Sequence, residues 1–96
     1  MKRVDALKVL RKYFQENAGK YSLKRMGLFG SVAREEAAEG SDVDVVVEFE
    51  RPNLFNQAAI MVELRERFGC DVDVVALWKR MNPRLKRRID AEAIYV

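Results

Sequence analysis

Residues 30–47 read GSVAREEAAEGSDVDVVV, and most of the architecture follows from this segment. Gly30 ends an apolar run, and a glycine followed by serine at such a point predicts a turn between a strand and a helix. Three valines follow Asp44, which is typical of a strand that is buried on both faces. Side chains alternate faces along a strand, so we expect Asp42 and Asp44 to project from the same side. The segment therefore predicts a buried strand that begins with two carboxylates on one face.

A second segment carries the same pattern, because Asp71-Val72-Asp73 leads directly into an apolar run over residues 74–77. If the two strands are neighbours, acidic groups from both meet at one place. Carboxylates packed that closely repel one another and are pushed toward protonation unless a divalent cation neutralises them. Mg²⁺ suits such a site, because it prefers oxygen ligands and keeps positions for water and substrate phosphates. The pattern indicates phosphoryl or nucleotidyl transfer. The spacing leaves open whether Asp71 or Asp73 is the third ligand.

The Gly30-Ser31 turn supplies the second half of the predicted site. Backbone amides at the start of a helix after Gly30 point toward an anion, and Ser31 adds a hydroxyl donor at the same place. The alternative is that Ser31 only caps the following helix. The spacing to Asp42 favours a phosphate-binding turn.

Composition excludes several kinds of site. The chain has 96 residues, no histidine and one cysteine, which excludes His-based triads, zinc sites with histidine ligands and an internal disulfide. Its apolar runs are too short to cross a bilayer, and we expect a cytoplasmic protein with no membrane contact. The 18 Lys and Arg residues and 15 Asp and Glu residues give a net charge of only +3, so nucleic acid is not the expected partner. The length predicts a single domain over residues 1–96.

Positive charge is concentrated near the C-terminus, in Lys79, Arg80, Arg84, Lys86, Arg87 and Arg88. Such a cluster can attract phosphate or an acidic partner. The simpler interpretation, which we favour, is that Leu85, Ile89 and Ala93 form the buried stripe of a short helix whose other face is solvated.

Helices and strands alternate along the chain. We expect helices over residues 4–17, 32–38, 54–68 and from 83 onward, and strands over 23–29, 41–49 and 70–77, with 94–96 returning to the sheet. Asn53 and the pair Asn82-Pro83 are expected to begin two of these helices, and Gly69 is expected to end one. The predicted fold class is α/β, with a small mixed β-sheet flanked by helices.

The combination of Gly30-Ser31, Asp42-Val43-Asp44 and the later strand Val72-Asp73-Val74-Val75 resembles the signature of the nucleotidyltransferase superfamily with the DNA polymerase β palm-like fold. The likeness runs along nearly the whole chain. It is strongest to the stand-alone minimal nucleotidyltransferases, which are often encoded beside a HEPN-domain partner as the antitoxin of a toxin–antitoxin pair.

The resemblance implies a role for each motif. Asp42 and Asp44 would hold two Mg²⁺ ions, and Asp73 would complete the site and help to activate the attacking hydroxyl. Gly30 and Ser31 would bind the triphosphate of ATP.

Arg34 lies where the family often has arginine. It would neutralise phosphate charge, or form an ion pair with Glu35, Glu36 or Asp42 that only fixes the helix.

The implied activity is the transfer of AMP from ATP to a hydroxyl of a HEPN toxin, which silences the toxin. The alternative is a non-catalytic antitoxin that neutralises the toxin by contact. Larger relatives carry a second domain that grips the acceptor, so we expect the partner protein to supply it here. Homo- and hetero-oligomers are both compatible with the sequence.

Overall fold

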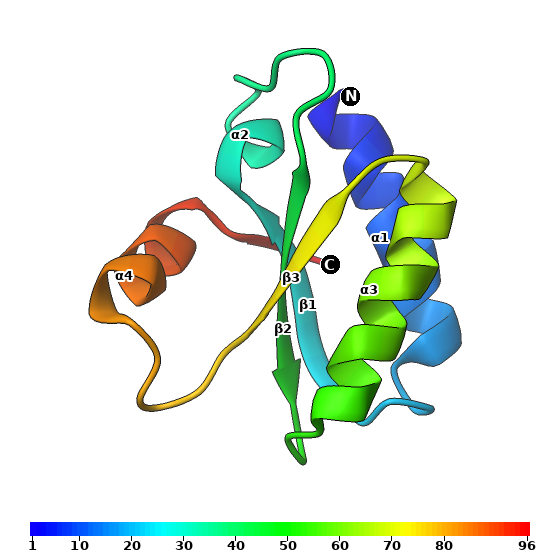
Figure 1. The fold of residues 1–96 in the computed structure, drawn as a ribbon, viewed down its shortest axis with the longest axis vertical. Coiled ribbons are helices and arrows are strands. Elements are labelled where there is room, and N and C mark those ends of the chain that lie inside the picture. The colour runs from blue at the N-terminus through cyan, green and yellow to red at the C-terminus, as the bar shows by residue number, and fades with distance from the viewer.

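Four strands form one mixed sheet in the computed structural model, which describes residues 1–96 (Figure 1). The elements in chain order are α1 (Arg3–Asn17), β1 (Leu23–Phe29), α2 (Gly30–Ala33), β2 (Val43–Phe49), α3 (Leu54–Phe68), β3 (Val72–Ala76), α4 (Pro83–Glu92) and β4 (Ile94–Tyr95). The predicted α/β class with a small mixed sheet is confirmed.

The strand order is β3-β2-β1-β4, and the strand directions determine what meets at each end of the sheet. β2 and β3 are parallel, so their N-terminal ends lie side by side, with Asp44 opposite Asp73. β1 is antiparallel to β2, which places the last residue of β1, Phe29, opposite Asp44. The turn after β1 and the acidic starts of β2 and β3 therefore share one end of the sheet.

Helices cover both faces of the sheet. Figure 1 shows α1 and α3 together on one side and α4 on the other. The larger core joins α1 and α3 to the sheet, and Val45 and Val47 of β2 belong to it. Val46 projects to the opposite face, where it packs with Phe29, Met81 and Ile89. The valine triplet thus supplies both cores, because side chains alternate along a strand. No helix is long and apolar enough to span a membrane.

The predicted helix ends are confirmed by their capping geometry. The Asn53 side chain accepts hydrogen bonds from the backbone amides of Phe55 at 2.9 Å and Asn56 at 3.2 Å. Asn82 caps α4 in the same way, and Pro83 occupies the first turn of that helix. Gly69 ends α3 in the left-handed conformation, with φ 70°. These local signals are strong because each satisfies backbone groups that a helix end leaves unpaired.

One predicted element is wrong. The helix expected over residues 32–38 is a single turn, Gly30–Ala33, and the chain leaves the helix with Glu35 at φ 60°. Arg34, Glu35 and Glu36 follow Ala33 and are all exposed, so the residues directly after this turn bury no apolar side chain that would extend the helix. The strands expected over 41–49 and 70–77 are also shorter, since β2 begins at Val43 and β3 spans Val72–Ala76.

Candidate functional site

Two carboxylates from separate strands are neighbours in the structure. Asp44 of β2 and Asp73 of β3 are register partners in the parallel ladder. Asp71 precedes β3 and is exposed, and its backbone carbonyl accepts a hydrogen bond from the Val43 amide at 3.0 Å. Of the two candidates that the sequence left open, Asp73 is therefore the residue that lies directly beside Asp44.

The Asp44 carboxylate packs closely against the backbone of Gly30. The glycine has φ 77°, and a Cβ placed on it would lie 2.1 Å from Oδ2 of Asp44. Any larger residue would therefore displace this carboxylate as well as strain the backbone. The Gly-Ser turn and the acidic pair form one site, with the Asp44 side chain packed against the glycine backbone.

The surroundings of Asp44 carry more negative than positive charge. Burial raises the pKa of the Asp44 carboxyl above its ordinary value, and the negative charges of Asp73 and Asp42 raise it further. Arg88 and Arg34 oppose this effect without cancelling it. A cation bound here would be stabilised by the same carboxylates that repel one another in its absence.

The carboxylates of Asp42, Asp44 and Asp73 are the type of ligand that a hard divalent cation prefers, but the three do not form a close cluster in the structure. No group of three acidic, cysteine or histidine side chains lies close enough together to hold a metal ion. Asp42 lies just before β2, where its charge reaches Asp44. Asp42 and Asp73 are both exposed, and the negative charge of each raises the pKa of Asp44. The all-oxygen donor set fits Mg²⁺ on these grounds.

Ser31 does not cap α2, because the helix begins at Gly30 with Phe29 as its N-cap residue. The Gly30 amide donates a hydrogen bond to Oε1 of Glu92 at 3.2 Å. Nη1 of Arg34 donates to the same oxygen at 2.6 Å, and Nε of Arg34 donates to Glu36 at 3.0 Å. Arg34 thus forms ion pairs, as one interpretation of the sequence expected, and its partners are Glu36 and Glu92.

Glu92 is the site residue that sequence reasoning missed. It lies 62 residues from Gly30 along the chain, at the end of α4. A single glutamate at the end of a helix carries no local signal, so only the fold reveals its position.

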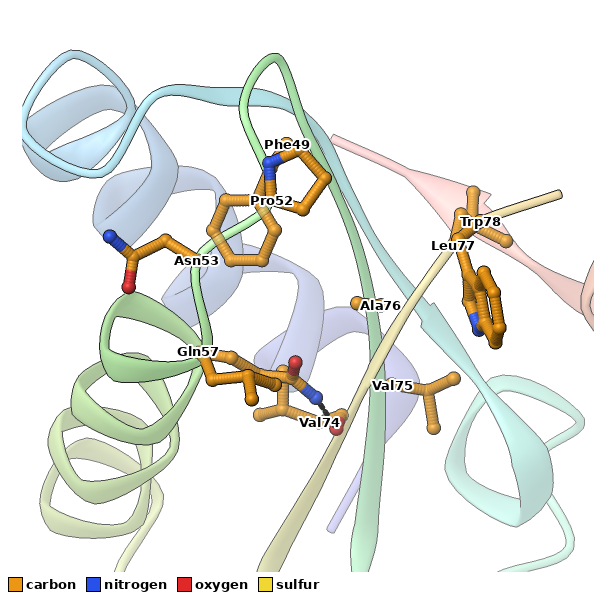
Figure 2. A pocket seen from close by; sticks show the side chains of 10 residues that line it. Phe49, Pro52, Asn53, Gln57, Val74, Val75, Ala76, Leu77 and Trp78 are labelled. Carbon is orange, nitrogen blue, oxygen red and sulfur yellow. Dashed lines mark hydrogen bonds between the residues drawn. The ribbon is translucent and has the colours of Figure 1, made fainter. Parts of the chain in front are cut away.

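An apolar hollow lies at the opposite end of the sheet from the acidic site. It has a volume of about 620 Å³ and is lined mainly by apolar side chains around the C-terminal ends of β2 and β3, including Phe49 and Trp78 (Figure 2). In Figure 2, Val74 and Val75 project to opposite sides of β3, and the Gln57 side chain donates a hydrogen bond to the Val74 carbonyl at 3.0 Å. Asp44 and Asp73 lie at the other ends of the same strands, so this hollow takes no part in the acidic site.

Comparison with known proteins identifies relatives along the whole chain. The model of the nucleotidyltransferase domain family matches residues 7–96. A Methanocaldococcus jannaschii protein, provisionally named a protein adenylyltransferase, is 37% identical over 100 residues that cover 100% of both chains. Protein adenylyltransferase MntA of Thermococcus cleftensis is 30% identical over 89 residues, covering 92% of this chain and 89% of its own.

Solved structures agree with these relatives. A structure provisionally named a minimal nucleotidyltransferase has a TM-score of 0.75 and 34% identity, covering 98% of this chain and 95% of its own. A toxin–antitoxin complex with AMP-PNP has a TM-score of 0.76 at 20% identity, over 92% of this chain and 69% of that chain. A Shewanella oneidensis complex of a tri-AMPylated HEPN toxin with an MNT antitoxin has a TM-score of 0.69 at 20% identity. The match covers 99% of this chain and 71% of that chain.

The last two similarities concern the fold alone, whereas the relatives above 30% identity and the family match extend to sequence. The motifs singled out above, from Gly30 to Asp73, all lie within the matched residues. The chain belongs to the nucleotidyltransferase family.

Proposed function

We propose that this protein is an Mg²⁺-dependent protein adenylyltransferase that moves AMP from ATP to a hydroxyl of a HEPN-domain toxin and thereby acts as its antitoxin in the cytoplasm. The observation that carries the proposal is the register pairing of Asp44 with Asp73 beside the Gly30 turn. Two comparisons support the choice of acceptor: the relative named protein adenylyltransferase MntA and the complex of an AMPylated HEPN toxin with an MNT antitoxin.

Three acids share the chemical work in this proposal. Asp42, Asp44 and Asp73 would hold two Mg²⁺ ions, which supply positive charge to the triphosphate and to the oxygens that enter and leave at the α-phosphorus. Asp73 accepts the proton of the attacking hydroxyl, whose oxygen forms the new bond to the α-phosphorus as the bond to the departing pyrophosphate breaks. Asp73 is exposed, so an acceptor side chain from another protein can reach it. Asp44 is more buried and fixes the position of the site through its contact with Gly30.

The triphosphate of ATP is placed at the Gly-Ser turn. Gly30 permits the close approach of ligand and backbone, and Ser31, which is not engaged as a helix cap, offers its hydroxyl. Arg34 is exposed and contributes a guanidinium beside the turn, although two carboxylates already share its charge.

The whole described chain, residues 1–96, is the catalytic domain in this proposal. In the same proposal the toxin supplies the hydroxyl that accepts AMP and the surface through which it contacts this domain.

The experiment uses ATP labelled at the α-phosphate, Mg²⁺ and the candidate HEPN partner. We expect the label to enter the partner with the native protein and to be lost with Asp42→Asn plus Asp44→Asn. Asp90→Asn is the matched control, because Asp90 is an exposed acid on α4 whose contact is Lys86 at 2.7 Å, and it should leave transfer unchanged.

A second candidate function is neutralisation by contact alone, and the absence of a preformed three-acid cluster is the observation that favours it. The same proteins separate the two functions. If the double variant still neutralises the toxin while transferring no label, neutralisation by contact is correct and the enzymatic account of neutralisation is wrong.

A further inference from the structure

Glu92 joins three parts of the site that are far apart in sequence. Its Oε1 accepts hydrogen bonds from the Gly30 amide at 3.2 Å and from Nη1 of Arg34 at 2.6 Å. Its Oε2 lies 3.8 Å from Nε of Arg88. Gly30 begins the Gly-Ser turn, and Arg34 follows the one-turn helix α2, so a single carboxylate connects both to α4.

The surroundings of Glu92 distinguish it from an ordinary surface ion pair. Its side chain is 19% exposed, compared with 57% for Asp90 on the same helix. A buried amide such as that of Gly30 is costly to leave without an acceptor, and charge-assisted hydrogen bonds of this kind are among the stronger ones. Glu92 is thus the acceptor for the first amide of the turn.

Both arginines held by Glu92 act on the acidic site. Arg34 and Arg88 are the two cations whose charge opposes that of the acids around Asp44. The Arg88 guanidinium also lies over the ring of Phe29, 5.9 Å from its centre, and Phe29 is the residue opposite Asp44 in the sheet. The carboxylate of Glu92 therefore sets where two guanidinium groups stand relative to the turn.

We propose that Glu92 is a positioning residue for nucleotide binding: its carboxylate fixes the Gly30–Ser31 turn and the Arg34 guanidinium against α4, so that both are in place before ATP binds. The inference rests on the proposed function, because it assigns the triphosphate to this turn. In this role Glu92 contacts neither phosphate nor metal. Because the turn and the Arg34 side chain are already held in place, ATP binding costs less conformational entropy.

The test compares Glu92→Ala, Glu92→Gln and Asp90→Ala with the native protein. In Glu92→Ala the turn amide and Arg34 lose their shared acceptor, and we expect the KM for ATP to rise about tenfold while kcat changes by less than about threefold. The Gln variant keeps an oxygen that can accept from the Gly30 amide, so the KM should return to within about threefold of the native value. Asp90→Ala should leave the KM unchanged.

A second readout needs no nucleotide. Amide hydrogen exchange at Gly30, measured by NMR, should accelerate in Glu92→Ala, recover in Glu92→Gln and stay unchanged in Asp90→Ala. Thermal unfolding of each variant confirms that the proteins compared are folded.

The outcomes separate this inference from the proposed function. If the native protein transfers AMP and Glu92→Ala has the native KM for ATP, the positioning role is wrong but the proposed activity is supported. The same holds if Glu92→Ala binds ATP more tightly, because the Glu92 carboxylate then competes with phosphate for the turn. If the native protein neither binds nor uses ATP, the proposed function fails together with the nucleotide role of Glu92, and the exchange rates then decide only whether the Glu92–Gly30 contact exists.

Discussion

Gly30→Ala tests the packing of the acidic site against the Gly-Ser turn. The added methyl group would lie 2.1 Å from Oδ2 and 2.9 Å from Cγ of Asp44, which is overlap in both cases. Alanine would also occupy φ 77°, in the left-handed region. The substitution therefore combines backbone strain with a forced movement of the Asp44 carboxylate, and we expect both lower stability and loss of AMP transfer.

The magnitude can be divided between the two causes. The left-handed conformation costs a residue other than glycine about 1–2 kcal/mol. Relief of the overlap by moving the Asp44 side chain or the backbone costs about 1–3 kcal/mol more. The expected loss is therefore roughly 2–5 kcal/mol, from a total stability of about 5–15 kcal/mol for a small protein.

Gly69→Ala is the matched control. Gly69 has φ 70°, and a Cβ there would meet nothing within 4 Å, so only the backbone cost of about 1–2 kcal/mol applies. Urea unfolding of both variants gives the comparison. The double variant Gly30→Ala/Asp44→Ala should recover the overlap contribution, as a coupling energy of about 1–3 kcal/mol. Equal losses for the two alanine variants, with no coupling to Asp44, would refute the close contact between turn and carboxylate.

Two further predictions concern other parts of the fold. A Cβ on Gly27 would lie 2.9 Å from Cδ1 of Tyr95, so Gly27→Ala should weaken the pairing of β4 with β1 and accelerate amide hydrogen exchange at residues 94–96. Unchanged exchange would show that β4 accommodates the methyl group without separating from β1. Glu63 accepts hydrogen bonds from the hydroxyls of Tyr13 and Tyr21. Burial raises the pKa of Glu63, but these hydrogen bonds and the positive charges of Lys20 and Arg67 together lower it below the ordinary value of 4.5. The ionised Glu63 carboxylate therefore stabilises the folded state fully above about pH 4.5, and this stabilisation is lost as the pH falls through the lowered pKa. Urea unfolding from about pH 3 to about pH 6 should show that the free energy of unfolding depends less on pH in Glu63→Gln than in the native protein. An unaltered pH dependence would exclude this role of Glu63.

The parts of the site that sequence predicts are those governed by local rules. The valines after Asp44 predicted a strand buried on both sides, and Val45 and Val46 do belong to the two different cores. The caps at Asn53 and Asn82 were predictable because they depend on a few adjacent residues.

The parts that sequence could not predict depend on how separate elements meet. Strand register pairs Asp44 with Asp73 and not with Asp71, a choice that the residue spacing left open and only the family resemblance indicated. The early end of α2 was not predicted either, because Ala37 packs against the larger core from outside the helix. The contact of Glu92 with Gly30 arises only when α4 folds back across the sheet. None of these features has a signal within a single segment.

We propose that Asp44 and Asp73 hold a divalent cation beside the Gly-Ser turn. Mn²⁺, which prefers the same oxygen ligands as Mg²⁺, broadens the NMR signals of amides near the place where it binds. Titration of the native protein should broaden the amides of residues 30–32, 42–44 and 71–74 first, and Asp44→Asn plus Asp73→Asn should abolish this selectivity. Broadening that begins elsewhere, for example at the exposed acids Glu35, Glu36 and Glu39, or that is unaffected by the double substitution, would contradict the account.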